Sequence, residues 1–316
     1  MTTSGVNTLS VTRDEIINMA FEDMGVYAPG MEAPEPGEIS TAAVRLNMML
    51  KAWQAANVGL WLHQTATLPL AAAAQSYNLG PTGANCSTLM GEAALAVAAV
   101  TADLTITVDD DTGITNGQYI GIEQDDDTIH WTTVNGVPVA NVVTLTAGMV
   151  EDAAIGSVVY FYTNKISRPL SIVEARISDV DGNETPLTVL SRNEYLTLPL
   201  KSAEGRTNSY YYDPQLTNGI LSVWPVNTVL SDKIIFTFRV PVQVFVNLND
   251  TPDFPYEWFD ALHYNLALRL CSAFTVPPQR RAEIKEMAAI TLQDADGFDR
   301  EQEVSIQIVP GYEGWE

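Results

Sequence analysis

The sequence predicts a mixed α+β protein with helical ends and a β-rich middle. Apolar residues recur at helical spacing near both ends of the chain. Short runs rich in β-branched and aromatic residues, separated by Gly, Asn and Asp turns, fill the centre. Residues 83–164 contain none of the sixteen basic residues, which indicates an inserted domain of different composition. We therefore expect a helical hairpin plus C-terminal helices, a mainly antiparallel β region, and an inserted small β-sandwich or barrel.

These patterns divide the chain into five segments. We expect an N-terminal helical hairpin with the first strands over residues 1–80, an inserted acidic β domain over 81–165, a β region over 166–254, C-terminal helices that complete the helical domain over 255–300, and a C-terminal extension over 301–316.

The first helix has clear signals at both ends. Thr12 and Glu15 form a capping box, and Gly25 is a stop signal. A second helix is expected from about Ile39 to Asn57. Its apolar stripe consists of Ile39, Ala43, Leu46, Leu50 and Trp53. Two amphipathic helices joined by a short loop form a hairpin that buries both stripes.

Short runs with strand character begin after the hairpin, at Leu60–Leu62, Thr65–Leu70 and Gln75–Pro81, the last ending in a turn. In the acidic block they are Leu104–Val108, Gln118–Ile122, Thr128–Val134, Val142–Leu145 and Val158–Tyr162, and after it Ser171–Ile177, Thr185–Leu190, Tyr210–Tyr212, Ile220–Trp224 and Lys233–Val240. Asp181–Asn183 is a hairpin turn signal. Ser191 and Glu194 are a capping signal for a short helix up to Leu198.

Two helices are expected near the C-terminus, followed by an alternating segment. Pro255 opens a helix with Phe259, Leu262, Leu266 and Leu270 on one face. The next helix covers about Gln279–Asp296. Val304–Val309 then alternates apolar and polar residues. Such a segment either adds a strand to another chain or folds back on its own sheet.

The formal net charge of −23 restricts the partners of the protein. Clustered Lys and Arg are needed to bind nucleic acid through its phosphates and to bind an anionic membrane surface. No signal peptide or membrane-spanning run is expected. Cys86 and Cys271 lie far apart, and we expect free thiols in a reducing compartment.

Motifs for catalysis and cofactors are missing from the sequence. It has no HExxH, no cysteine pair at zinc spacing, no Gly-rich phosphate loop and no GxSxG elbow. His63, His130 and His263 fall in different predicted elements. We therefore expect no enzyme, no cofactor and no metal. The runs Asp109–Asp111 and Asp125–Asp127 have the oxygen ligands that calcium prefers, but their spacing does not match an EF-hand, which favours solvated turns.

Aromatic residues form the densest apolar cluster in the middle of the chain. Tyr210, Tyr211 and Tyr212 precede Trp224 by one strand. Strand alternation places Tyr210 and Tyr212 on one face and Tyr211 on the other. The cluster is either half core and half surface or a protein interface, where Tyr and Trp are enriched.

An ordered set of segments outside the acidic block covers about 200 residues. They are Thr12–Ile17, Leu46–Trp53, Ser76–Gly80, Arg168–Leu170, Ser191–Tyr195, Gly205–Thr207, Tyr211–Pro214, Leu221–Pro225, Asn249–Pro255 and the helix with Ala261–Leu262 and Asn265–Ala267. Through the order of these segments, rather than through one motif, the sequence resembles the head-to-tail adaptor family of short-tailed bacteriophages, also called packaged-DNA stabilisation or tail accessory proteins.

The resemblance implies a structural virion protein at the head–tail junction, assembled in the host cytoplasm. The helical domain builds a ring of twelve copies under the portal and extends the DNA channel, through which packaged DNA passes without specific binding. The ring helps to retain DNA, and the β part faces the downstream tail or nozzle protein. The C-terminal extension, with Val304, Ile306, Ile308, Tyr312 and Trp315, docks on the portal. No membrane is involved.

The contact between neighbouring copies is a separate hypothesis. The aromatic β residues with Trp224, or the third helix with Trp258, are expected to meet the helical hairpin of the next copy. Two other functions stay open: a tail-associated enzyme that degrades cell wall, and a receptor- or carbohydrate-binding module carried by the inserted domain.

Overall fold

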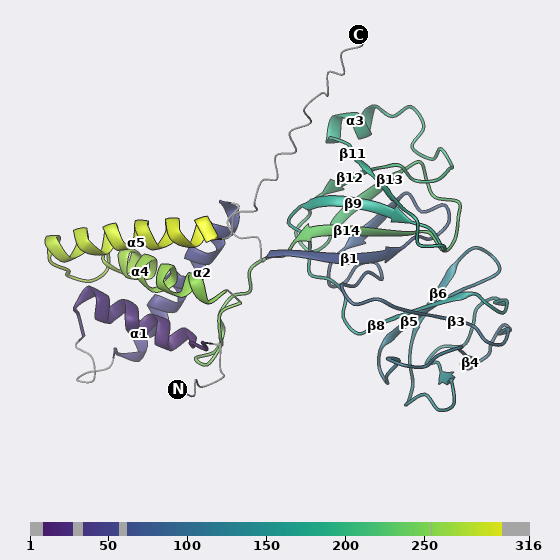
Figure 1. The fold of residues 1–316 in the computed structure, drawn as a ribbon, viewed down its shortest axis with the longest axis horizontal. Coiled ribbons are helices and arrows are strands. Elements are labelled where there is room, and N and C mark those ends of the chain that lie inside the picture. The colour runs from purple at the N-terminus through teal and green to yellow at the C-terminus, as the bar shows by residue number, and fades with distance from the viewer. Residues whose placement is uncertain (1–8, 28–33, 57–61, 254, 299–316) are drawn as a thin grey trace, which may run out of the picture. The chain divides into compact units, whose positions relative to one another are not determined.

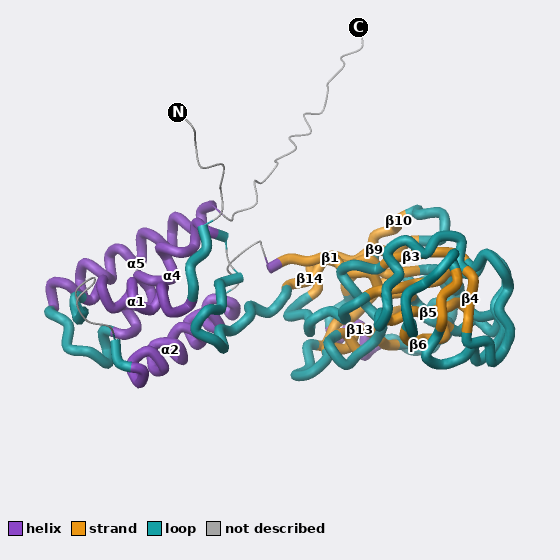
Figure 2. The backbone as a smooth tube through the Cα atoms, turned by 90° about the horizontal axis from the view of Figure 1, so that it is seen from below, coloured by secondary structure: helices purple, strands orange, loops and turns teal. Residues whose placement is uncertain are grey.

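A computed structural model describes residues 9–27, 34–56, 62–253 and 255–298 (Figure 1). It is a mixed α+β fold with helices at both ends of the chain and mostly antiparallel sheets between them. The chain divides into a helical unit, residues 1–62 and 242–316, and a β unit, residues 63–241. All strands belong to the β unit, and the long helices belong to the helical unit, whereas one short helix, α3 (Arg192–Thr197), lies in the β unit (Figure 2).

The helical unit is built around one central helix. Helix α4 (Phe259–Leu270) packs against α1 (Arg13–Met24), α2 (Pro36–Ala55) and α5 (Pro278–Phe298). The 3-10 helix η2 (Tyr256–Trp258) leads into α4. The core that these helices share includes Phe21, Leu46, Leu50, Trp53, Trp258, Leu262, Leu266 and Ile284. The hairpin of α1 and α2 therefore buries its stripes mainly against α4, which the sequence places about 200 residues later.

The ends of the helices follow their local sequence. Both hydrogen bonds of the Thr12–Glu15 capping box are present, and Gly25 ends α1 with a φ of 69°. Helix α2 starts at Pro36, earlier than the predicted Ile39. The reason is a second capping box, in which Glu35 is the N-cap and Glu38 reaches back to its amide.

Residues 242–253 form a strap that is hydrogen-bonded to α2 and to the start of α1. The Asn47 amide group donates to Phe245 O and accepts from Phe245 N, both at 2.9 Å. Lys51 Nζ donates to Val242 O at 2.6 Å. The Arg13 amide donates to Asp250 O at 2.8 Å. Polar side chains of α2 thus supply partners that this extended segment lacks within itself.

Two four-stranded sheets form the part of the β unit outside the acidic block. The first has the order β1 (His63–Pro69), β14 (Lys233–Arg239), β9 (Ile172–Ser178), β10 (Glu184–Pro186) and is antiparallel. The second has the order β11 (Thr188–Val189), β12 (Ser209–Asp213), β13 (Gly219–Trp224), β2 (Ser76–Leu79), with β11 parallel to β12. Their shared core includes Leu68, Leu79, Ile177, Tyr210, Leu221, Val223, Phe236 and Phe238.

The acidic block has a hydrophobic core of its own. A four-stranded sheet, β3 (Gly91–Ala94), β8 (Val158–Tyr162), β5 (Tyr119–Glu123), β6 (Ile129–Thr133), accompanies the pair β4 (Thr105–Thr107) and β7 (Val142–Thr144). Both contribute to a core that includes Leu95, Ile106, Val108, Ile120, Ile122, Val143, Leu145 and Val159. The ends of the block lie together, because Lys165 Nζ donates to Gly83 O at 2.6 Å.

The structure confirms most predicted strands and changes two. All five strands expected in the block are present. Strand β3 was not predicted, because its sequence Gly-Glu-Ala-Ala lacks β-branched and aromatic residues. The run Thr185–Leu190 is two strands, since the chain changes sheets at Leu187. The Asp181–Asn183 turn joins β9 to β10, and Ser191 caps the short helix α3 (Arg192–Thr197) as expected.

Candidate functional site

The four aromatic residues singled out in the β unit lie on neighbouring strands but in different surroundings. Tyr210 is buried in the sheet core. Tyr211 is half-buried and stacks on Tyr195 of α3, with ring centroids 5.4 Å apart. Tyr212 donates its hydroxyl proton to Pro169 O, and burial raises its pKa to about 12. Trp224 is half-buried and donates from Nε1 to Leu200 O at 3.0 Å. Tyr211, Tyr212 and Trp224 thus each keep part of their surface exposed, and Tyr210 does not.

Trp258 lies in the centre of the helical core with 0% exposure. Its ring meets that of Trp53 edge to face, at a centroid distance of 5.6 Å. The side chain therefore stabilises the helical unit and has no surface available to a partner. The predicted portal-docking residues, Val304, Ile306, Ile308, Tyr312 and Trp315, lie outside the described residues.

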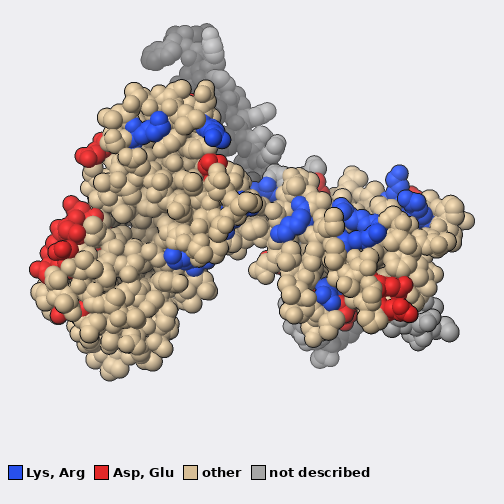
Figure 3. Space-filling model, turned by 180° about the vertical axis from the view of Figure 1, so that it is seen from behind, with Lys and Arg blue, Asp and Glu red and all other residues tan. Residues whose placement is uncertain are grey.

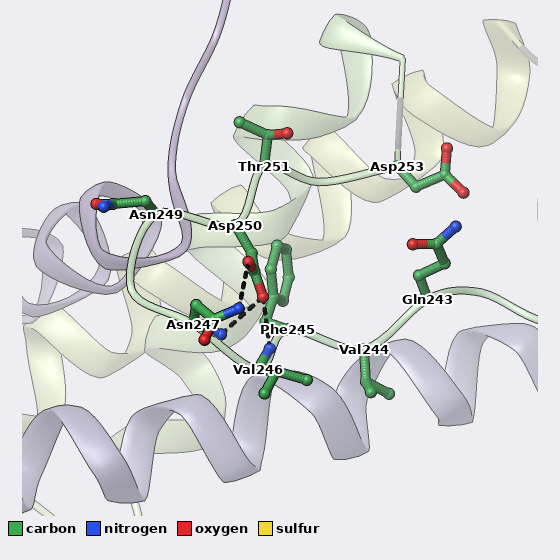
Figure 4. A pocket seen from close by; sticks show the side chains of 9 residues that line it. All are labelled: Gln243, Val244, Phe245, Val246, Asn247, Asn249, Asp250, Thr251 and Asp253. Carbon is green, nitrogen blue, oxygen red and sulfur yellow. Dashed lines mark hydrogen bonds between the residues drawn. The ribbon is translucent and has the colours of Figure 1, made fainter.

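The strap lines a polar cavity in the helical unit, with a volume of about 480 Å³ (Figure 4). Its lining is Gln243, Val244, Phe245, Val246, Asn247, Asn249, Asp250, Thr251 and Asp253. The Asp250 carboxylate points into the loop and accepts from the amides of Val246 and Asn247, both at 2.7 Å. Asn247 Nδ2 donates to its other oxygen at 3.1 Å.

These contacts define the electrostatics of the cavity. The amide donors of Asn247 and Val246 hold the pKa of Asp250 below its usual range, and Arg13 lowers that pKa further. The carboxylate is therefore ionised at neutral pH, with its oxygens bound by its own loop. Sequence reasoning missed this group, because its partners lie only three and four residues away in a segment with no regular structure.

Aspartates in the turns of the β unit accept hydrogen bonds from backbone amides. Asp109 accepts from the Ala94 amide at 2.8 Å, Asp111 from Asn141, and Asp125 from Ala154. Asp152 accepts from the amide and hydroxyl of Thr101, and these hydrogen bonds lower its pKa. Figure 3 shows acidic side chains gathered along one edge of the β unit. The acid-rich composition of the block thus has a structural use in its tight turns.

One carboxylate of the block is buried instead. Glu123 is 5% exposed and accepts from the Tyr160 hydroxyl at 3.0 Å. It also accepts from Ser231, from the amide at 3.0 Å and from the hydroxyl at 2.9 Å. Burial raises the pKa of Glu123, while these hydrogen bonds oppose the shift. The hydrogen bonds of Glu123 connect the block to the turn before β14, and the ion pair between Lys233 and Glu92 connects it to the first residue of β14.

His263 is the one histidine near two acids in the described structure. Its Nδ1 lies 2.6 Å from Asp23 Oδ2, and its Nε2 lies 3.4 Å from Asp260 Oδ1. The ring is buried and joins α4 to α1, which is a structural role. Among the described residues, no group of three His, Cys, Asp or Glu side chains has the geometry to hold a metal ion.

Comparisons with known proteins found no relative. The sequence matches no protein-family model and no curated protein sequence.

None of the described helices has both the length and the apolar character that crossing a membrane requires.

Proposed function

We propose that this chain is the head-to-tail adaptor of a short-tailed bacteriophage. In this proposal the helical units of twelve copies form a ring beneath the portal and extend the DNA channel. The β units face the downstream tail protein, and the acidic block is an inserted domain of the β-sandwich or barrel kind. The protein acts in the virion neck as a structural component, without catalysis.

The proposal rests on contacts between the segments that resemble the adaptor family. Three of them, Thr12–Ile17, Leu46–Trp53 and Asn249–Pro255, are far apart in sequence but converge around the strap. Arg13 donates to Asp250 O, and Asn47 holds the adjoining Phe245. Segments that are similar by chance have no reason to contact one another in the fold.

The charge of the protein supports a channel that DNA crosses without adhering. A net charge of −23 disfavours the counterion release that drives phosphate binding. Repulsion between like charges also lowers friction on DNA that must leave rapidly.

The test is to remove the protein from the virion. A phage with a stop codon early in this gene should yield heads that package DNA, then lose it, and carry no tail in electron micrographs. Supplying the chain in trans should restore both properties. Tailed, DNA-filled particles without the protein would contradict the proposal, as would clearing of purified cell walls by the purified chain, which would favour an enzyme.

A further inference from the structure

Helix α2 exposes an apolar stripe on the side that faces away from its core. Val44 is 59% and Met48 64% exposed, one helical turn apart. Val244 of the strap lies beside them and is 45% exposed. With Asn47 and Lys51 these residues line a shallow hollow of about 440 Å³. We call Val44, Met48 and Val244 the α2 stripe.

Helix α5 has a second apolar stripe, with a different charge. Met287 and Ile290 are 38% and 46% exposed on one flank of the helix. Exposed acids continue the same flank at helical spacing: Glu286, Asp294 and Glu283, the last of which is paired with Arg280 at 3.2 Å. Ile284 and Ala288 face the core instead. We call Met287 and Ile290, with these three acids, the α5 stripe.

The two stripes are complementary in charge as well as in apolar character. Helix α2 has no acid after Glu38, and its later charges are Arg45 and Lys51. Arg45 Nη1 donates to two neutral oxygens, Arg269 O at 2.6 Å and Ser272 Oγ at 2.8 Å. A basic rim beside one apolar stripe and an acidic rim beside the other favour contact between unlike surfaces and disfavour contact between like ones.

The stripes lie on separate surfaces of the helical unit. Helix α4 packs against both α2 and α5, and Figure 2 shows these two helices on opposite sides of it. We infer that the α2 stripe of one copy binds the α5 stripe of a second copy of this chain. Such a heterologous contact leaves one free stripe at each end, so it repeats and closes into a ring when the rotation permits. The inference rests on the proposed function, because a ring requires a contact of this type.

Paired cysteines test this pairing directly. The purified chain with Met48→Cys and Ile290→Cys together should give a ladder of disulfide-linked oligomers on oxidation when the portal protein of the same phage is present. Either substitution alone should give no ladder. The natural thiols, Cys86 and Cys271, are buried. Dimers from Met48→Cys alone would overturn the inference, since they would indicate contact between two α2 stripes.

Added charges provide the second test. Met48→Glu should abolish the ring, and combining it with Ile290→Lys should restore it. Val180→Glu is the control, because Val180 is as exposed (72%) but lies in a turn of the β unit. Wild-type rings that survive Met48→Glu would overturn the pairing and leave the adaptor function standing. A wild-type chain that forms no ring even on the portal would overturn both.

Discussion

Trp258 is a central residue in the packing of the helical unit. Among the described residues it is the largest fully buried side chain, and it contacts Trp53 of α2 from the start of α4. Because it belongs to the core, its substitution reports on folding and not on contacts between copies.

We expect Trp258→Ala to lower the free energy of unfolding by about 3–5 kcal/mol, through lost burial and the cavity it leaves. The measurement is urea denaturation of the monomer. Tyr256→Ala is the matched control, an exposed aromatic in the same 3-10 helix, with an expected loss below about 1 kcal/mol. Equal losses in the two variants would contradict the structure.

Glu123 provides a pH-dependent contribution to stability. Burial raises its folded-state pKa above the ordinary value of 4.5, so the folded protein binds this proton more tightly than the unfolded chain. The stabilisation is therefore complete below about pH 4.5 and is lost as the pH rises through the folded-state pKa.

Glu123→Gln should remove this dependence while keeping acceptors for Tyr160 and Ser231. The stability of the variant relative to wild type, from urea midpoints, should increase between pH 4 and pH 7. A difference that is flat or that falls over this interval would show that Glu123 is ionised in the fold without penalty. Asp152→Asn is the control, because that exposed carboxylate has a lowered pKa.

At the scale of elements, the strap is held by side chains of α2. Asn47 satisfies both backbone groups of Phe245, whose ring belongs to the helical core. Asn47→Ala leaves these groups without their partner, and we expect a loss of about 1–3 kcal/mol.

Hydrogen exchange locates this effect. In Asn47→Ala the amide of Phe245 should exchange faster. Amides in the middle of α4 should keep the order of exchange rates that they have in the wild type. Gln243→Ala, at an exposed strap position, should change neither stability nor exchange. Protection of Phe245 in Asn47→Ala would mean that packing alone holds the strap.

Elements were predictable from sequence where their causes are local. The capping boxes at Thr12 and Ser191 join residues three apart and were predicted correctly, whereas the equally local box at Glu35 was missed because Glu is not a preferred N-cap residue. The strap was not, because Asn47 and Phe245 are 198 residues apart. The same applies to the candidate site: the aromatic strands were found, but burial of Trp258 and of Tyr210 depends on partners that sequence spacing does not reveal.

At the scale of the whole molecule, the chain enters and leaves the β unit at adjacent points. His63 pairs with Arg239 across β1 and β14. Residues 63–241 therefore close on themselves, and we expect this fragment to fold alone, with a cooperative thermal transition and a β-type circular dichroism spectrum. A fragment without a transition would show that the β unit needs the helical unit.

Assembly of this chain into an adaptor ring on the portal is most directly measured by native mass spectrometry of the purified chain, with and without the portal protein of the same phage. We expect a 34.4 kDa monomer alone and, with portal, a complex that has gained twelve copies of the chain. A chain that stays monomeric when portal is in excess would rule out the adaptor ring.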